Sequence, residues 1–315
     1  MPAIPIRTGT AMPAMGSSPP RGILVVDKPA GPSSHAVVAW ARKALGLRKI
    51  GHAGTLDPAA TGVLVLGVGA GTRLLGHLAG DDKEYLITFV FGIGTTTDDA
   101  QGDITEAPGA VVEADALRSA MQRWTGDILQ RPSAVSAIKV DGKRAYDLVR
   151  SGQEVELAAR PVHVSAFDLL DVRRERLAVD GEPEVDVTVA DVRVVGSAGT
   201  YVRALARDVA AELGTVGHVR DLRRTRSGSF GIDDALPADD ITADGLIPLH
   251  EAARRCLPVV EVGQQDVWPI RHGVQIPWPN GAPREGTVAL LCGDDLIALA
   301  EGRGMKARYA VVFPE

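Results

Sequence analysis

Valine residues alternate with polar residues over residues 184–195, and this pattern constrains the fold more than any other feature of the chain. Val185, Val187 and Val189 share one face of an extended strand, and the alternation goes on through Val192 and Val194. A period of two residues predicts a strand with one buried and one solvated face. Such strands are typical of antiparallel sheets whose apolar face is covered by other elements.

The rest of the chain interleaves further strands with helices. Strands are expected over residues 23–26, 63–68, 85–91, 134–140, 163–172 and 216–230, and helices over residues 35–45, 72–78, 114–124, 143–150 and 200–213. Turns, not crossover helices, join many of the strands, which disfavours a doubly wound parallel sheet. We therefore predict an α+β fold with a mixed, mainly antiparallel sheet and flanking helices.

The length of 315 residues suggests roughly two domains, at about 150 residues each. We interpret residues 1–20 as a disordered tail because they are rich in Ala, Pro, Gly and Ser without an apolar signal-peptide core. Residues 21–250 form the expected main domain. From residue 251 onward, short apolar runs between Pro and Gly residues predict a small all-β domain, residues 251–315.

Composition excludes several classes of protein. Apolar runs are far shorter than the ~18 residues of a membrane span, so no membrane association is expected. Cys256 and Cys292 are distant in sequence and have no His or Cys partners at metal-binding spacing. This argues against disulfides and a zinc site and favours a reducing, cytoplasmic location.

The net charge of −6 argues against a protein whose main task is nonspecific binding of nucleic acid. The charges are nevertheless separated along the chain, which matters more than their sum. Basic residues gather at residues 42–43, 48–52, 139–150 and 220–226. If the fold brings these segments together, the molecule has one cationic side.

The segment 51–62, Gly-His-Ala-Gly-Thr-Leu-Asp-Pro-Ala-Ala-Thr-Gly, holds a single carboxylate, Asp57, among three glycines. Its glycines allow the backbone to approach a ligand closely, and Pro58 keeps Asp57 out of the helical region. By the local pattern alone, an Asp that caps a turn or helix is the more common interpretation. The hypothesis of a functional Asp57 depends on the remainder of the chain.

Other common active-site patterns are missing from the sequence. Residues 67–71, Gly-Val-Gly-Ala-Gly, lie between a strand and a helix, but the third glycine of a dinucleotide-binding fingerprint would fall at Thr72. There is no P-loop, no metalloprotease histidine pair and no Gly-x-Ser-x-Gly turn. Neither a cofactor nor a metal is expected.

Two further residues are candidates for the same site. Arg203 opens a helix directly after a strand, where it could pair with a carboxylate, although a surface arginine is the more common case. Two unit charges about 4 Å apart interact by about 4 kcal/mol at an effective dielectric constant near 20, enough to keep an aspartate ionised. Tyr85 begins a strand, where simple core packing is the alternative role.

Six motifs in order resemble one family. They are Asp-Lys-Pro-Ala-Gly-Pro-Ser-Ser (27–34), the segment 51–62, Lys-Glu-Tyr (83–85), Arg-Pro-Ser-Ala-Val-Ser-Ala-Ile-Lys (131–139), Gly-Thr-Tyr-Val-Arg (199–203) and Leu-Arg-Arg (222–224). Over residues 22–230 the chain resembles the TruB tRNA pseudouridine synthases, stand-alone bacterial enzymes, here of actinobacterial type. The C-terminal region is similar, more loosely, to the RNA-binding PUA domain of that family. The resemblance implies the pseudouridine-synthase fold and isomerisation of the T-loop uridine (uridine-55) of tRNA.

The resemblance also implies roles for individual residues. Asp57 matches the catalytic aspartate, Arg203 the arginine that pairs with it, and Tyr85 the tyrosine that stacks on the target base. Substrate-binding roles are implied for Lys28 and Pro29 (support of the Asp57 loop), His52 (filling the space of the flipped nucleotide) and Leu222 (packing on the extruded base). Candidate phosphate contacts are Arg42, Lys43, Arg48, Lys49, Lys139, Lys143, Arg144, Arg220, Arg223, Arg224 and Arg226.

The chemistry requires no redox step or metal, and Asp57 could act as a nucleophile or as a base on the sugar. The expected partner is the tRNA T arm, bound by a monomer without an obligate protein partner. Three alternatives stay open: a noncatalytic RNA-binding or tRNA-folding protein on the same scaffold, a guide-RNA-dependent relative, and a nucleosidase or glycosidase acting on small molecules.

Overall fold

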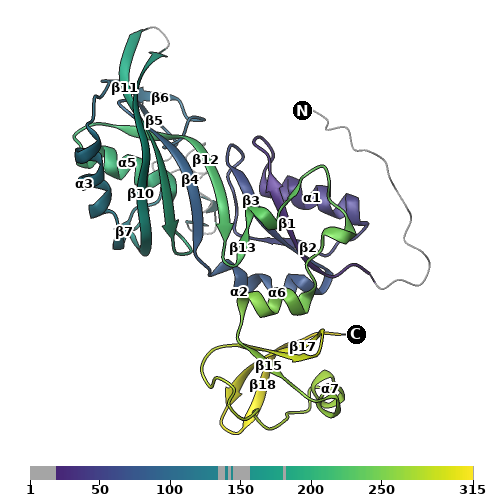
Figure 1. Ribbon diagram of the computed structural model, residues 1–315. Helices are drawn as coiled ribbons and strands as arrows, with labels where there is room; N and C mark the ends of the chain where they lie inside the picture. The colour runs from purple at the N-terminus through teal and green to yellow at the C-terminus, as the bar shows by residue number, and fades with distance from the viewer. Residues whose placement is uncertain (1–18, 134–138, 141–142, 145–156, 180–181, 315) are drawn as a thin grey trace. The chain divides into compact units, whose positions relative to one another are not determined.

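The structure is a computed structural model that describes residues 19–133, 139–140, 143–144, 157–179 and 182–314. The chain divides into two compact units. The first unit comprises residues 1–58, 62–79 and 227–315, and the second comprises residues 59–61 and 80–226. Figure 1 labels most of the helices and strands of both units.

The first unit is built around a small mixed sheet. β1 (Gly22–Lys28) pairs antiparallel with β3 (Thr61–Val68) and parallel with β14 (Leu236–Pro237), while β2 (Ile50–Ala53) pairs antiparallel with β3. Six of the seven β1 residues are buried, as the apolar sequence predicts. The short helices η1 (Gly69–Arg73) and α2 (Leu75–Ala79) follow β3.

Helix α1 (Ser34–Leu45) corresponds to the helix expected over residues 35–45. Ser33 is its N-cap and accepts a hydrogen bond from the Ala36 N–H at 3.2 Å. Gly46 ends the helix with φ 62°, a left-handed conformation that glycine adopts without strain. The buried face of α1, with Val37 and Ala41, packs into the same hydrophobic core as Leu64 of β3.

The C-terminal part of the first unit contains a separate four-stranded sheet. Its order is β15 (Val259–Glu261), β16 (Val288–Cys292), β17 (Asp295–Arg303) and β18 (Lys306–Val312), which confirms the small C-terminal sheet domain. The segment is not purely β, because α7 (Gln264–Arg271) starts at Gly263, whose N–H bonds the Asp266 carboxylate. Because this helix is short and contains Pro269, the sequence pattern does not predict it.

Elements that connect the two sheets of the first unit are short. They are β13 (Phe230–Gly231), η2 (Ile232–Asp234), η3 (Ala243–Gly245) and α6 (Leu249–Cys256). Phe313, which is 1% exposed, lies in one hydrophobic core with Val25 of β1, Ala253 of α6 and Leu299 of β17. The C-terminal sheet therefore shares a core with the N-terminal strands of its unit.

The second unit contains a sheet of longer strands. β4 (Lys83–Phe91), β11 (Glu182–Gly196), β10 (Arg160–Val179) and β7 (Gly126–Gln130) pair antiparallel in that order, and β12 (Gly217–Ser227) lies beside β4. The alternating valines of residues 184–195 lie in β11, where Val187, Val189 and Val192 are fully buried.

One face of these strands is covered by α3 (Ala114–Arg123) and α5 (Val202–Glu212) (Figure 1). Their buried residues form one core with Phe89 and Phe91 of β4. Smaller pairs are β5 (Gly94–Thr95) with β6 (Ile104–Glu106), and β8 (Lys139–Val140) with β9 (Lys143–Arg144). The α+β fold with a mainly antiparallel sheet is thus confirmed.

Two predicted elements have other outcomes. The helix expected over residues 143–150 is wrong where it can be compared, since Lys143–Arg144 is strand β9, and residues 145–150 lie outside the described part of the chain. The strand expected over residues 134–140 is described only at its end, in β8. The motif around residues 134–138 therefore lies outside the described residues.

Candidate active site

The loop that carries Asp57 runs from β2 to β3, and a buried serine fixes its backbone just before the aspartate. The Ser34 hydroxyl, 1% exposed, accepts a hydrogen bond from the Leu56 N–H at 2.9 Å and donates one to the Leu56 carbonyl at 3.0 Å. Both polar backbone groups of Leu56 are thus satisfied by one side chain from the start of α1. Our sequence analysis missed this contact, because Ser34 lies 22 residues from Leu56.

A buried ammonium group fixes the residue after Asp57. Lys28 is 0% exposed, and its Nζ donates to the carbonyls of Pro29, Pro32 and Pro58 at 2.9, 2.9 and 3.0 Å. The Pro58 carbonyl also accepts from the Gly31 N–H at 2.8 Å. Both chain neighbours of Asp57 are therefore fixed, and its half-buried side chain extends from a restrained backbone.

These contacts are the ones that a supporting role for Lys28 and Pro29 requires, and they explain why a charged group is buried there. Burying an ammonium is costly unless its N–H groups are hydrogen-bonded, and three carbonyls meet that need. The substrate-binding role of the two residues stays a prediction.

His52 lies in β2, opposite Leu66 of β3. Its ring meets the ring of His35 edge to face, with ring centroids 5.2 Å apart. His35 is exposed on the first turn of α1, next to Ser34. Two imidazoles thus lie beside the elements that hold the Asp57 loop, and only His52 was expected from the sequence.

Arg203 lies in the first turn of α5, as predicted, and is 9% exposed. Its Nη1 donates to the Thr97 carbonyl at 2.9 Å and to the Asp99 carboxylate at 3.1 Å. Asp99 is in turn held by the Thr97 hydroxyl at 2.6 Å and by the Gln101 N–H at 3.0 Å. Asp99 is a candidate functional residue that the sequence analysis missed, since nothing local marks a partner 104 residues from Arg203.

Tyr85 lies in β4, half-buried against the core of the second unit. Its hydroxyl is hydrogen-bonded to Arg224 of β12, a residue that is 1% exposed. Burial lowers the pKa of the Arg224 guanidinium. The pKa of Lys83 is also lowered, mainly by burial and in addition by repulsion from Arg224. For Arg224, this contact favours a role in holding Tyr85 over the phosphate contact expected from the sequence.

Leu222 and Arg223 adjoin the end of the Asp57 loop through Thr61. The Thr61 hydroxyl donates to the Leu222 carbonyl at 3.5 Å, and Arg223 Nη1 lies 3.4 Å from the same hydroxyl oxygen. The Leu222 side chain packs, half-buried, against the core that contains Tyr85. For Lys139, the structure describes only its backbone, paired with Arg144 in β8–β9.

The predicted residues form two groups. Lys28, Pro29, His52 and Asp57 belong to the first unit, whereas Tyr85, Arg203 and residues 222–224 belong to the second. A meeting of Asp57 with Tyr85 and Arg203 stays a prediction of the family resemblance.

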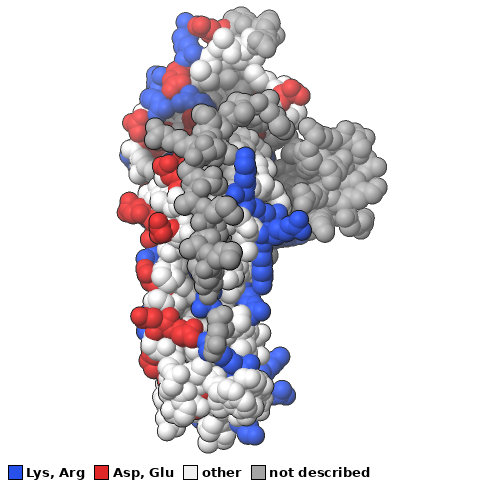
Figure 2. Space-filling view, turned by 90° about the vertical axis from the view of Figure 1, so that its right-hand side faces the viewer, with Lys and Arg blue, Asp and Glu red and all other residues white. Residues whose placement is uncertain are grey.

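Basic side chains on the surface offer contacts for phosphates. Arg42, Lys43, Arg48 and Lys49, around the end of α1, are all exposed. Lys and Arg side chains are also visible on the face drawn in Figure 2. Arg220, another expected contact, instead donates to the Glu175 carboxylate at 2.8 Å.

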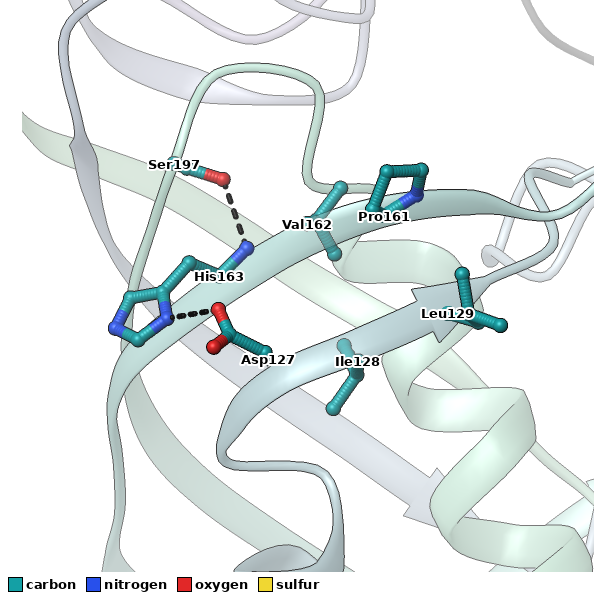
Figure 3. Close-up of a pocket in the computed structure, with 7 residues that line it drawn as sticks. All are labelled: Asp127, Ile128, Leu129, Pro161, Val162, His163 and Ser197. Atoms are coloured by element: carbon teal, nitrogen blue, oxygen red, sulfur yellow. Dashed lines mark hydrogen bonds and ion pairs between the residues drawn. The ribbon is translucent and has the colours of Figure 1, made fainter.

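A hollow of about 400 Å³ lies elsewhere in the second unit, against β7 and β10 (Figure 3). His163 and Asp127 line it, with Nδ1 of the His163 ring hydrogen-bonded to the Asp127 carboxylate at 2.7 Å, and the backbone N–H of His163 donates to the Ser197 hydroxyl at 2.9 Å. None of the predicted site residues lines this hollow, so we do not assign the active site to it.

The described residues show neither a metal centre nor a membrane span. Within them, no group of three or more His, Cys, Asp or Glu side chains is arranged to hold a metal ion. None of the helices in the part of the chain that the structure describes is long and apolar enough to cross a membrane.

Comparison with known proteins identifies the family. Residues 42–202 match the model of the TruB family pseudouridylate synthase N-terminal domain, and residues 203–257 match that of the tRNA pseudouridylate synthase B C-terminal domain. The chain belongs to the TruB family. It is accordingly an RNA pseudouridine synthase, as the resemblance of its motifs implies.

Similar proteins extend over nearly the whole chain. A tRNA pseudouridine synthase B of Leifsonia xyli is 46% identical over 93% of this chain and 96% of that protein. One from Streptomyces griseus is 46% identical over 93% and 97%. Among solved structures, an H/ACA RNP bound to a substrate RNA that contains 2'-deoxyuridine has a TM-score of 0.67 at 26% identity, covering 93% of this chain and 85% of that one.

Proposed function

We propose that this TruB-family enzyme converts the T-loop uridine of tRNA (uridine-55) to pseudouridine, with Asp57 as the catalytic carboxylate. The observation that carries the proposal is the restraint of Asp57 from both sides, by Ser34 through Leu56 and by Lys28 through Pro58. A carboxylate on a loop fixed in this way is preorganised for chemistry at one point. The names of the relatives, which specify tRNA, support the substrate.

The reaction is an isomerisation. The N1–C1′ bond of uridine breaks, the uracil rotates, a C5–C1′ bond forms and the C5 proton is lost while N1 gains one. Asp57 acts either as a nucleophile or as a base on the sugar, since carboxylates do comparable work at anomeric carbons in glycosidases. Arg203, to which the family resemblance assigns a role in the site, forms an ion pair with Asp99.

Tyr85 and Leu222 are suited to receive a base that has left its stack. Extrusion of a nucleotide costs a few kcal/mol, and stacking on an aromatic ring returns about 1–3 kcal/mol per base. In this proposal the ring of Tyr85, held through its hydroxyl by Arg224, stacks on the uracil. Leu222 then packs on the base edge, and His52 fills the space that the base leaves.

The remaining expectations belong to the same proposal. The exposed basic residues at the end of α1, with Arg223 and Lys139, contact phosphates of the T arm, which proteins recognise through its shape and its loop bases. The enzyme acts as a cytoplasmic monomer without an obligate protein partner. Residues 21–250 form the catalytic domain and residues 251–315 a PUA-like RNA-binding domain.

Release of tritium from C5-labelled uridine in tRNA tests the proposal. Wild-type protein should release the label from naked tRNA and, more slowly, from an isolated T-arm hairpin, whereas Asp57→Asn should release none above background. Absence of release by the wild type would leave the noncatalytic RNA-binding alternative. Activity without any added guide RNA would exclude a guide-dependent enzyme, and light scattering would report the oligomeric state.

A further inference from the structure

The loop that presents Asp99 to Arg203 carries a second aspartate, Asp98, in an unusual conformation. Asp98 has φ 58°, whereas every other residue with positive φ in the described part of the chain is a glycine. A side chain makes this backbone region unfavourable, and glycine would relieve the strain. Aspartate adopts this region more readily than most other residues, because its short side chain can form hydrogen bonds nearby, and the Asp98 carboxylate has a partner on another element.

The partner of Asp98 is Arg207, one helical turn after Arg203 on α5. Arg207 Nη1 donates to the Asp98 carboxylate at 3.1 Å. Residues four apart lie on the same face of a helix. Arg203 and Arg207 therefore hold the adjacent carboxylates Asp99 and Asp98 from two successive turns of α5.

Arg207 also connects this loop to two other segments. Its Nη2 donates to the Arg131 carbonyl at 2.7 Å, just after β7, and its Nε donates to the Asp208 carboxylate at 2.9 Å. The neighbouring Gln130 side chain holds both backbone groups of Tyr201, directly before α5. Arg207 thus lies where the loop, the end of β7 and the first turns of α5 meet.

The backbone of the loop is also held against β12. The Val219 N–H donates to the Asp98 carbonyl at 3.0 Å, and the Ala100 N–H donates to the Val219 carbonyl at 2.9 Å. The backbone around Asp98 and Asp99 is therefore fixed on the β12 side, and Arg207 holds the Asp98 side chain from the α5 side.

We infer that Arg207 is a positioning residue, which acts through Asp98 to set the geometry of the Arg203–Asp99 pair. This inference rests on the proposed function of Arg203. The Arg207 side chain is a third exposed, so its ion pair with Asp98 contributes little to the free energy of unfolding. A gain in stability therefore does not explain the positive φ of Asp98.

Kinetics of tritium release from labelled tRNA test this role in four variants, Arg207→Gln, Arg207→Lys, Asp98→Asn and Asp98→Gly. We expect Arg207→Gln and Asp98→Asn to lower kcat about tenfold or more, with KM for tRNA within about twofold, as for a loss of positioning. Arg207→Lys should lose less than Arg207→Gln. The double variant Asp98→Asn/Arg207→Gln should be no slower than either single variant, because one interaction is lost.

Asp98→Gly separates positioning from stability. Glycine relieves the backbone strain, so the melting temperature should not fall, yet kcat should fall as in Asp98→Asn. The matched control is Arg123→Gln, which breaks a pair between α3 and Glu212 at the far end of α5 and should keep kcat. Wild-type kcat in Asp98→Gly or Arg207→Gln would overturn the inference, whereas an inactive wild-type protein would overturn the proposed function itself.

Discussion

Removal of the Ser34 hydroxyl should release the Asp57 loop, and the structure gives the size of the effect. In Ser34→Ala, the N–H and carbonyl of Leu56 lose their partner in a buried site. Each unsatisfied buried backbone group costs about 1–3 kcal/mol, so the two groups together lower the stability of the held loop by about 2–6 kcal/mol. A loss of 2 kcal/mol lowers the ratio of held to released loop about thirtyfold, and thirtyfold is then the largest fall in kcat that this loss can cause.

Two measurements follow the loop and the chemistry separately. Amide hydrogen exchange at Leu56 should accelerate in Ser34→Ala, because the opened loop exposes that N–H. Single-turnover tritium release should slow, while the affinity for tRNA stays close to that of the wild type.

Ser33→Ala is the matched control, one residue away. Ser33 caps α1 but does not contact the Asp57 loop in the contacts described above, so its removal costs about 1 kcal/mol of stability without slowing turnover. If Ser34→Ala turns over at the wild-type rate and its Leu56 amide exchanges no faster, the restraint of Asp57 by Ser34 is refuted.

Three further outcomes are expected. Phe313→Ala should destabilise the first unit by about 3–5 kcal/mol in denaturant unfolding, because Phe313 is fully buried in the core shared by both of its sheets; an unchanged midpoint would contradict that core. Burial lowers the pKa of His218 from its ordinary 6.5, so on acidification the unfolded chain binds a proton at this histidine before the folded chain does. The free energy of unfolding should therefore fall as the pH drops below about 6.5, by up to about 1.4 kcal/mol per pH unit. His218→Leu should remove this contribution to the pH dependence of stability. Binding of tRNA should weaken steeply with salt despite the net charge of −6, and a salt-independent affinity would argue against phosphate contacts.

Local patterns in the sequence predict the elements well where they are strong. The alternation of valines predicts β11, and the helix expected over residues 35–45 is α1. The patterns fail at α7, which contains a proline, and at β9, which is expected as a helix. In such short elements a weak local preference does not decide between helix and strand.

The candidate site divides in the same way. Asp57, Tyr85 and Arg203 are found through motifs, since each has neighbours in sequence that mark it. Asp99 and Arg207 lie in none of the motifs, and the contact of Ser34, which ends the motif 27–34, is not evident from the sequence, because the partners lie 104, 109 and 22 residues away and the pairing exists only in the folded chain. The sequence therefore indicates the residues that we propose to react, and the structure adds the groups that we propose to hold them.

This division has a kinetic consequence. In the proposed mechanism, which uses no cofactor, the rate must come from the placement of a carboxylate and its partners, and a displacement of about 1 Å can cost about a hundredfold in rate. Groups such as Ser34 and Arg207, which in our proposals do not touch the RNA, should then affect kcat and leave KM unchanged, whereas exposed basic residues such as Arg48 and Lys49 should affect KM and its salt dependence. Variants of the two kinds should therefore combine additively, because binding to phosphates and positioning of the loop do not share a contact.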